Sequence, residues 1–196
     1  MVVVSISGSP SPASRSAWLL QQVAERAGRR IERHHAIAVR DLPVQPLLRG
    51  DTTDAAIAWA HRAVAQAQAV LIGTPIYKAA YSGLLKLFLD ALPPDALRGK
   101  PVLALATGGS AGHLLALDYA LKPVLSALGA RHIVDAVYAV DAQLVRAPDG
   151  GYVPDDGLLQ RLDQALDALL LCHAANARRN PARNPDTAEV AVRLHC

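Results

Sequence analysis

Serine hydroxyls and one arginine are concentrated in the segment SISGSPSPASRS, residues 5–16. The segment follows the apolar run MVVV and precedes AWLLQQVAERAG, whose apolar spacing predicts a helix. Ser14 is a favourable N-cap, so the amides that follow it would point out of the positive end of that helix. Together with the hydroxyls of Ser9, Ser14 and Ser16 and the guanidinium of Arg15, these amides would suit a phosphate group.

Two other kinds of phosphate-binding loop are disfavoured by the sequence, and one alternative without a ligand remains. The chain contains neither GxxxxGK[ST] nor GxGxxG, which disfavours a triphosphate P-loop and a dinucleotide fingerprint. A Ser/Pro-rich connection with a capped helix and no ligand remains the alternative to a phosphate site.

Two further loops have unusual compositions. TPIYKAAYSG, residues 74–83, carries an aromatic ring at Tyr77, and its Lys78 could be either a ligand contact or an ordinary surface lysine. The run TGGS, residues 107–110, would let a planar ligand approach the backbone, because glycine has no Cβ. A phosphate site, a ring-bearing loop and a glycine-rich edge together suit a flat ring system with a phosphate tail.

The order of elements predicts where these loops lie. Short apolar runs predict strands at residues 1–7, 33–39, 69–75, 101–107 and 132–140. Helical spacing predicts helices at residues 14–27, 52–66 (capped by Asp51 or Thr52), 82–92, 113–128 and 156–174. Apolar strands that alternate with helices indicate an α/β fold, a three-layer sandwich with a parallel sheet covered on both faces. The flavodoxin-like order 2-1-3-4-5 would bring the three loops to one end of the sheet, where ligands bind.

Composition sets the broad class. The chain has 196 residues, is 52% hydrophobic and 19% charged, and carries a formal charge of +3, which indicates a folded protein with no strong bias toward nucleic acid. No apolar run is long enough to cross a membrane, and Cys172 and Cys196 make neither a disulfide framework nor a metal site. We expect one domain over residues 1–176, a flexible tail over residues 177–196, and a cytoplasmic location.

The sequence resembles the NADPH-dependent FMN reductases of the flavodoxin-like superfamily, and among them the FMN reductases of two-component alkanesulfonate monooxygenase systems. The resemblance rests on SGSPSPASRS, TPIYKAAYSGLLKLFLDALP, LATGGSAGHLLALDYALKPVLSALGA and HIVDAVYAVD, and it covers about residues 1–175.

The resemblance implies a set of FMN contacts. The FMN phosphate would be bound by Ser9, Ser14, Arg15 and Ser16. The isoalloxazine ring would be flanked by Pro75, Ile76, Tyr77 and Lys78. The polar edge of the ring would be lined by Thr107, Gly108, Gly109 and Ser110. Relatives often carry an arginine soon after GSP, where this chain has Ser11, so Arg15 is the one cation expected in this loop.

The implied reaction is transfer of a hydride from NADPH or NADH to FMN, which needs no catalytic side chain and no metal because the cofactors carry the chemistry. Reduced FMN would pass to a partner monooxygenase, in alkanesulfonate sulfur metabolism. A quinone or azo reductase is the alternative within this fold, and a non-enzymatic flavin-binding module or electron carrier is the alternative outside enzymes. A single aromatic ring near the site favours an open flavin face, and hence the reductase.

Two of the predicted helices have features that indicate a subunit interface. Pro123 interrupts the pattern HLLALDYALKPVLSAL and frees the Tyr119 carbonyl, which predicts a kink or a π-bulge. One possibility is that Tyr119 packs in the core beside a plain proline kink. The other is that Tyr119 lies at a subunit interface near the flavin, which the resemblance to the alkanesulfonate-type reductases implies, because those reductases have a π-helix at such an interface. The segment 82–92 is apolar around nearly its whole circumference, so we expect a homodimer or homotetramer.

Overall fold

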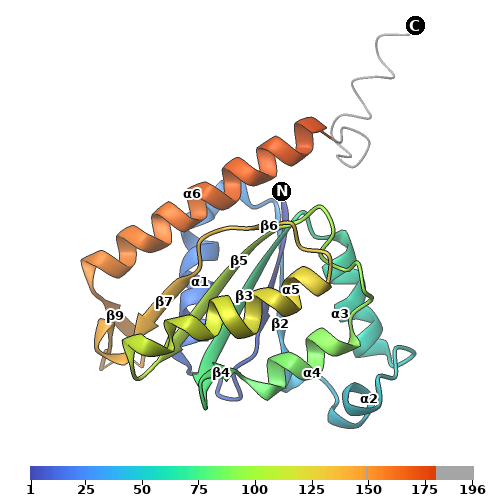
Figure 1. Ribbon diagram of the computed structural model, residues 1–196, viewed down its shortest axis with the longest axis horizontal. Helices are drawn as coiled ribbons and strands as arrows, with labels where there is room; N and C mark the ends of the chain where they lie inside the picture. The colour runs from blue at the N-terminus through green and yellow to red at the C-terminus, as the bar shows by residue number, and fades with distance from the viewer. Residues whose placement is uncertain (149, 180–196) are drawn as a thin grey trace, which may run out of the picture.

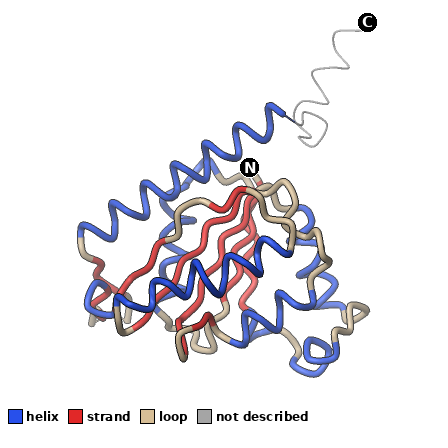
Figure 2. Tube along the Cα trace, in the orientation of Figure 1, coloured by secondary structure: helices blue, strands red, loops and turns tan. Residues whose placement is uncertain are grey.

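The structure, a computed structural model, describes residues 1–148 and 150–179. The fold has three layers, with a central sheet between two layers of helices (Figure 1). The strands lie side by side through the middle of the molecule, and the helices surround them (Figure 2).

The main sheet is parallel and runs in the order β2-β1-β3-β5-β6. Its strands are β1 (Val2–Ser7), β2 (Arg33–Ala38), β3 (Ala69–Tyr77), β5 (Pro101–Gly108), β6 (His132–Ile133) and β7 (Val137–Val140). β6 and β7 both pair with β5, so the single strand predicted over 132–140 is interrupted at residues 134–136. Counted along the chain, this is the predicted flavodoxin-like order 2-1-3-4-5, which is confirmed.

Each face of the sheet carries its own hydrophobic core. Successive strand residues point to opposite faces, so Val4 and Ile6 belong to one core while Val3 belongs to the other. The first core lies under α2 (Val44–Arg49), α3 (Ala55–Gln66), α4 (Gly83–Ala91) and α5 (Lys122–Ala127). The second lies under α1 (Arg15–Ala27) and α6 (Asp156–Arg179). Burial on both faces explains why the strands read as continuous apolar runs.

Helix starts follow side-chain caps. Ser14 caps α1 as predicted, since its Oγ accepts from the Ala17 amide at 3.1 Å. The predicted cap of the next long helix was wrong: Asp54 accepts from the amides at the start of α3, at 2.9 and 3.2 Å, whereas Asp51 accepts from the Thr53 amide in the preceding turn. Several Asp and Thr residues precede this helix, and the choice among them depends on the turn.

Among the described residues, one short α-helix and three short strands were not predicted: α2, β4 (Ala80–Tyr81), β8 (Leu144–Arg146) and β9 (Tyr152–Pro154). Because of Pro46, the sequence pattern predicted an irregular connection where the structure has α2. Pro46 lies in the first turn of that helix, where the backbone N–H has no partner within the helix and its loss costs nothing. The strands have two or three residues each and are too short to show a periodicity.

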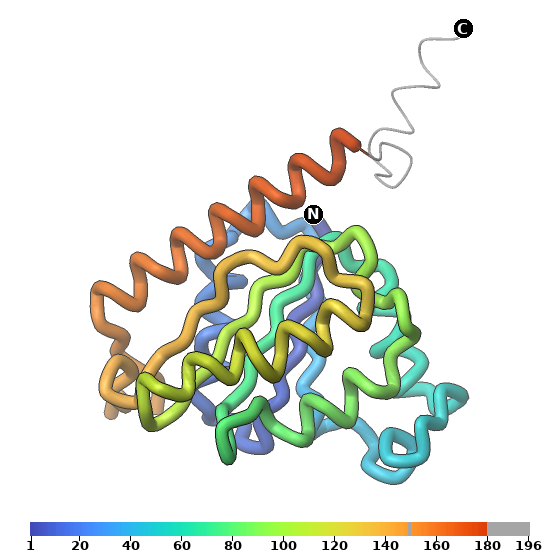
Figure 3. Tube along the Cα trace, viewed as in Figure 1, coloured from blue at the N-terminus to red at the C-terminus, as the bar shows by residue number. Residues whose placement is uncertain are grey.

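The segment predicted as one helix over 113–128 has three parts. A 3₁₀ turn, η3 (Ala111–Leu114), leads to a π-helix, η4 (Leu117–Leu121), which runs directly into α5 (Figure 3). The Lys122 amide donates to the Leu117 carbonyl, five residues back, immediately before Pro123. The predicted π-bulge is therefore present. Tyr119 is 79% exposed, so the alternative that it packs in the core is wrong.

The last helix is longer than predicted. α6 continues past residue 174 to Arg179, so residues 177–179 of the expected tail belong to the helix. The rest of that segment, 180–196, lies outside the described residues. No helix in the described part of the chain has both the length and the apolar character needed to cross a membrane.

We predict that Ala79→Gly stabilises the fold. Lys78 and Ala79 join β3 to β4 with φ of 51° and 61°, a conformation that costs a residue with a Cβ about 1 kcal/mol or more. Glycine relieves that strain but adds freedom to the unfolded chain, which leaves an expected net gain of about 0.5–1 kcal/mol in urea unfolding. The control Ala80→Gly, at the next position in β4, should destabilise the fold. A loss of stability in Ala79→Gly would contradict the strain argument.

Candidate functional site

The loops after β1, β3 and β5 meet at the carboxyl end of the sheet. The Gly8 amide donates to the Gly73 carbonyl at 2.8 Å, which continues the β1–β3 pairing into the first loop. Pro75 and Thr107 are partners in the β3–β5 register, so the second and third loops leave adjacent strands at the same level. The site thus lies at the switch point between β1 and β3, where open α/β sheets bind ligands.

Ser82 joins the first two loops. Its Oγ donates to the Gly8 carbonyl at 2.5 Å and accepts from the Leu85 amide at 3.1 Å as the N-cap of α4. Its own amide donates to Thr74 Oγ1 at 3.0 Å. A Cβ at Gly8 would lie 2.5 Å from the Cβ of Leu85, so only glycine allows this approach. One buried hydroxyl therefore fixes the first loop relative to the second.

The serines of the first loop lie close together around the start of α1. Ser9 and Ser16 are buried, and the hydroxyl oxygens of Ser14 and Ser16 are 3.3 Å apart. Ser9 Oγ accepts from the Ser11 amide at 3.2 Å, which leaves its proton available for donation. The Ala17 amide is used by the cap, so the amides at positions 15 and 16 are the ones positioned for an anion.

Arg15 points toward a neighbouring hairpin. Its Nε donates to the Leu144 carbonyl at 3.3 Å, and its Nη1 lies 3.5 Å from Asp141 Oδ1. The guanidinium also lies 5.5 Å from the centre of the Tyr152 ring, whose hydroxyl donates to the Ala13 carbonyl at 2.8 Å. The β8–β9 hairpin is thereby fastened to the serine loop, and the role of Arg15 as a phosphate ligand stays a prediction.

The four residues expected to flank a flavin ring divide into two pairs. Pro75 and Ile76 are buried within β3. Tyr77 and Lys78 lie at the exposed end of the β3–β4 hairpin, and the Tyr77 side chain is 53% exposed. The rigid strand thus presents an aromatic ring and a cation beside the switch point.

The glycine-rich edge is supported from below by Tyr138. The Tyr138 hydroxyl donates to the Ser110 carbonyl at 2.7 Å, and burial, with a smaller contribution from Asp141, raises its pKa, so it remains a protonated donor at neutral pH. A Cβ at Gly108 would lie 2.5 Å from that hydroxyl oxygen, whereas a Cβ at Gly109 would meet open space. Gly108 is required for packing, and Gly109 leaves its backbone approachable.

His113 lies directly behind the glycine-rich run of residues 107–110. The His113 amide donates to the Ser110 carbonyl at 3.1 Å, which places the histidine directly behind the loop. Its Nδ1 is buried, and no group among the described residues forms a hydrogen bond with it. The accessible backbone at Gly109 is what a planar ring with heteroatoms would use. Across residues 1–148 and 150–179, no cluster of three or more His, Cys, Asp or Glu side chains could hold a metal ion.

Sequence reasoning missed three residues that hold the site together: Ser82, Tyr138 and Tyr152. Ser82 could have been found, because a serine before an apolar helical run is an N-cap signal. The hydroxyls of Tyr138 and Tyr152 bond to carbonyls that are 28 and 139 residues away in the sequence, respectively. No local sequence pattern predicts such contacts.

Comparisons with known proteins identify the family of this chain. The profile of the family described as NADPH-dependent FMN reductase matches residues 1–144. The chain is 44% identical over 180 residues to an FMN reductase (NADPH) of Pseudomonas putida, an alignment that covers 91% of this chain and 90% of the relative. It is 44% identical over 170 residues to an FMN reductase (NADPH) of Escherichia coli, covering 85% and 87%.

A solved structure is also similar. The apo form of the NADH:FMN oxidoreductase EMOB superposes with a TM-score of 0.78 at 42% sequence identity, covering 86% of this chain and 88% of that one. The fold, the glycine-lined edge at the switch point and these relatives lead to one assignment. The chain belongs to the NADPH-dependent FMN reductase family and is an NAD(P)H:FMN oxidoreductase.

Proposed function

We propose that this reductase releases its reduced FMN to a partner monooxygenase, in alkanesulfonate sulfur assimilation in the cytoplasm. The observation that carries the proposal is the exposure of Tyr77, the aromatic residue of the β3–β4 hairpin at the mouth of the site. A flavin held beside one exposed ring keeps a face open to the nicotinamide and can leave after reduction. A flavin clamped between two aromatic residues would suit a carrier instead.

The serine loop would hold the FMN phosphate. Ser9 and Ser16 supply buried hydroxyls, and the start of α1 supplies two amides at its positive end. Arg15 is 34% exposed and its Asp141 partner 53% exposed, so their ion pair is worth less than about 1 kcal/mol. A phosphate dianion can therefore draw the guanidinium away from Asp141 and back over the loop.

The ring would lie between the hairpin and the glycine-rich edge. Bound FMN supplies the hydride acceptor. The chain orients it: Pro75 and Ile76 give a rigid floor, Tyr77 and Lys78 flank the open side, and residues 107–110 offer backbone groups to the polar edge. Tyr138 keeps that edge in place through its bond to Ser110.

We also propose that the π-helix forms part of a subunit interface in a homodimer or homotetramer. Tyr119 is accompanied by two further exposed apolar side chains on the same segment, Leu114 and Leu115, at 44% and 57%. A π-bulge costs stability and recurs at functional sites. The segment also begins one residue after the Ser110 loop, so an interface here would adjoin the flavin.

The reductase proposal predicts a preference for FMN over riboflavin. Loss of the phosphate should raise KM about tenfold or more, since each charge-assisted hydrogen bond is worth about 1.5–3 kcal/mol. Ser9→Ala and Arg15→Gln should weaken FMN use and leave riboflavin use nearly unchanged, which makes riboflavin the internal control. The assay is oxidation of NADPH, and separately of NADH, over many turnovers while the concentration of FMN or of riboflavin is varied.

Equal effects of these variants on both flavins would contradict the phosphate assignment. Tight retention of FMN with negligible NADPH oxidation would contradict the reductase, and quinone reduction faster than FMN reduction would favour the alternative enzyme.

The interface proposal predicts that Tyr119→Ala lowers the oligomeric state or weakens assembly at least about tenfold in analytical ultracentrifugation, because it removes a large exposed aromatic side chain from the contact. Tyr119→Phe keeps the ring and should assemble nearly as the parent does. FMN exchange should change in parallel with assembly. A parent chain that is monomeric at micromolar concentration would contradict the proposal.

A further inference from the structure

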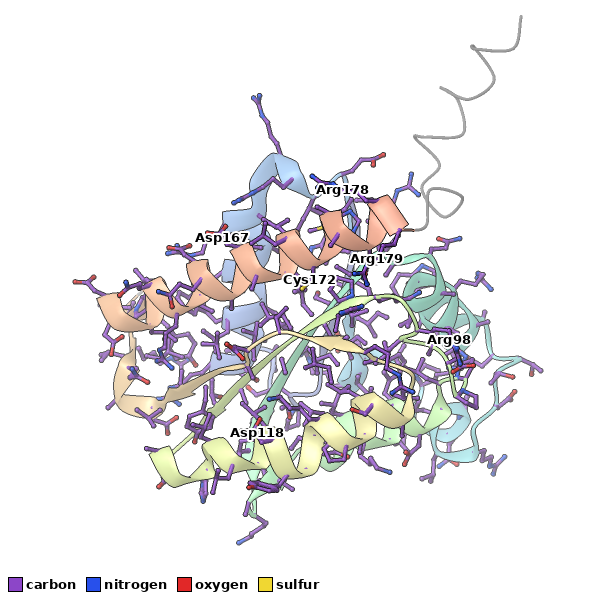
Figure 4. The ribbon with its side chains drawn as sticks, turned by 45° about the horizontal axis from the view of Figure 1, so that its top comes forward. Arg98, Asp118, Asp167, Cys172, Arg178 and Arg179 are labelled. Atoms are coloured by element: carbon purple, nitrogen blue, oxygen red, sulfur yellow. The ribbon has the colours of Figure 1, made fainter. Side chains whose placement is uncertain are left out.

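A groove lies beside the edge strand β2, on the face of the sheet that α1 and α6 cover. It has a volume of about 500 Å³ and runs between α1 and β2. The helices leave it open because α1 packs mainly on β3 and β5, and α6 on β5 and β7. Asp167 and Cys172 mark α6 in Figure 4, where this helix lies beside α1. Among the residues that the structure describes, β2 contributes none to the core under these two helices.

The floor of the groove consists of small side chains from two paired strands. In the β1–β2 register, Ser5 lies opposite Ala36. Two residues further on, Ser7 lies opposite Ala38, and all four residues line the groove. They share the face of Val3, which belongs to the core under α1. Because the floor is small and Ala36 is exposed, a flat ligand can approach the sheet itself.

One stripe of α1 forms the wall of the groove. Its residues follow the spacing that places side chains on one side of a helix: Ala17, Leu20, Gln21, Ala24 and Glu25. The helix follows β1 and runs back along the sheet, so Ala17 lies toward the carboxyl ends of the strands and Glu25 toward their amino ends. The wall from Ala17 to Glu25 is about 12 Å long.

The end of the groove nearer the flavin site carries a cation and an unpartnered hydroxyl. Arg40 lines this end, and its Nε lies 3.4 Å from the largely exposed carboxylate of Asp41, a weak pairing in water. Ser7 is 7% exposed, and its Oγ forms no hydrogen bond with any group in residues 1–148 or 150–179. Buried hydroxyls are nearly always bonded in folded proteins, so a polar ligand is expected to use this one.

The far end of the groove carries a carboxylate and a neutral imidazole. Glu25 accepts from Gln21 Nε2 at 2.7 Å, and a carboxylate has room for further donors. His34 Nε2 lies 2.9 Å from the hydroxyl oxygen of Ser5. Burial, with a smaller contribution from His35, lowers the pKa of His34, so its ring is neutral at physiological pH. The groove thus has a cation at one end and hydrogen-bond acceptors at the other.

The reaction supplies a ligand with the same order of groups. Only the nicotinamide of NAD(P)H reacts with the flavin, and its adenosine half has phosphate at one end and a base with an amino group at the other. The groove begins directly beside the serine loop, since Ser7 precedes Gly8 and Ala17 follows Ser16. β2 lies two strand spacings, about 10 Å, from β3, which carries Tyr77. An extended dinucleotide can span such a distance.

We propose that the groove between α1 and β2 binds the adenosine half of NAD(P)H. Arg40 would bind a phosphate group, and the two alanines of the floor would support the flat base. Glu25 would accept from the amino group of the base, beside the Ser5–His34 pair. The volume is within the range of small-ligand sites, which combine apolar walls with a few convergent polar groups. The inference rests on the proposed position of the flavin at the carboxyl end of the sheet.

The first test measures binding without turnover. 5′-ADP and 2′,5′-ADP are titrated into the full chain, saturated with FMN, at constant ionic strength while amide NMR signals are followed. We expect saturable shifts at residues 17–25 and 34–40. Absence of saturable shifts there up to about 10 mM of either probe would overturn the proposal. Because FMN stays bound throughout, such a failure would leave the flavin site untouched, whereas failure of the flavin site would show in the comparison of FMN with riboflavin.

The variants separate a built groove from general positive charge. Arg40→Gln should weaken binding of the probes about tenfold, because a charge-assisted hydrogen bond is lost. Ala36→Leu fills the floor without a change of charge and should weaken both probes at least as much. Arg33→Gln is the matched control: it removes the same charge from the same strand, at a position that pairs with Val2, points to the other face and does not line the groove. It should change binding less than about twofold.

Equal weakening by Arg33→Gln and Arg40→Gln would overturn the proposal. A larger effect of Arg40→Gln on 2′,5′-ADP than on 5′-ADP would assign Arg40 to the 2′-phosphate, and equal effects would assign it to the pyrophosphate; either result supports the groove.

Steady-state kinetics give a second readout. Ala36→Leu should raise KM for NADPH and NADH about tenfold and leave kcat and the KM for FMN nearly unchanged, since only the adenosine half loses its contacts. Reduced nicotinamide mononucleotide lacks that half, so the variant and the parent should use it equally well. An equal loss with reduced nicotinamide mononucleotide would place the defect at the flavin and contradict the proposal.

Discussion

Burial of the parallel sheet on both faces is the constraint from which the rest of this structure follows. The strands are apolar on both sides, and each side has its own core under its own helices. The loops that follow the strands are therefore where backbone groups and polar side chains of several strands converge. We propose that the flavin binds at the carboxyl end, where the loops after β1, β3 and β5 meet.

At the carboxyl end, a few buried hydroxyls convert three separate loops into one rigid site. Ser82 fixes the first loop to the second, and Tyr138 supports the third. Both bonds join a hydroxyl to a main-chain carbonyl, so they position backbone and leave ligand-facing groups free. Preorganisation of this kind is what hydride transfer between two cofactors requires of a protein, because the cofactors supply the chemistry themselves.

The layers, the strand order and the position of the three loops could be predicted from the sequence, because they depend on runs of apolar residues and on parallel-sheet topology. The π-helix could be predicted as well, since Pro123 removes a donor inside a helical pattern. The hairpin from 144 to 154 could not, because its strands have three residues each. The orientation of Arg15 depends on that hairpin, so it could not be predicted either: Tyr152 and Asp141 are distant in sequence and attract the guanidinium only once the chain is folded.

We propose that the serine loop at the start of α1 holds the FMN phosphate. The most direct test is the difference between the amide NMR spectra of the FMN-bound and riboflavin-bound chain, because the two flavins differ only in the phosphate. We expect the differences to be concentrated at residues 8–17, with further change at Asp141 and Tyr152 as Arg15 leaves the hairpin. Differences centred elsewhere, with residues 8–17 unchanged, would contradict it.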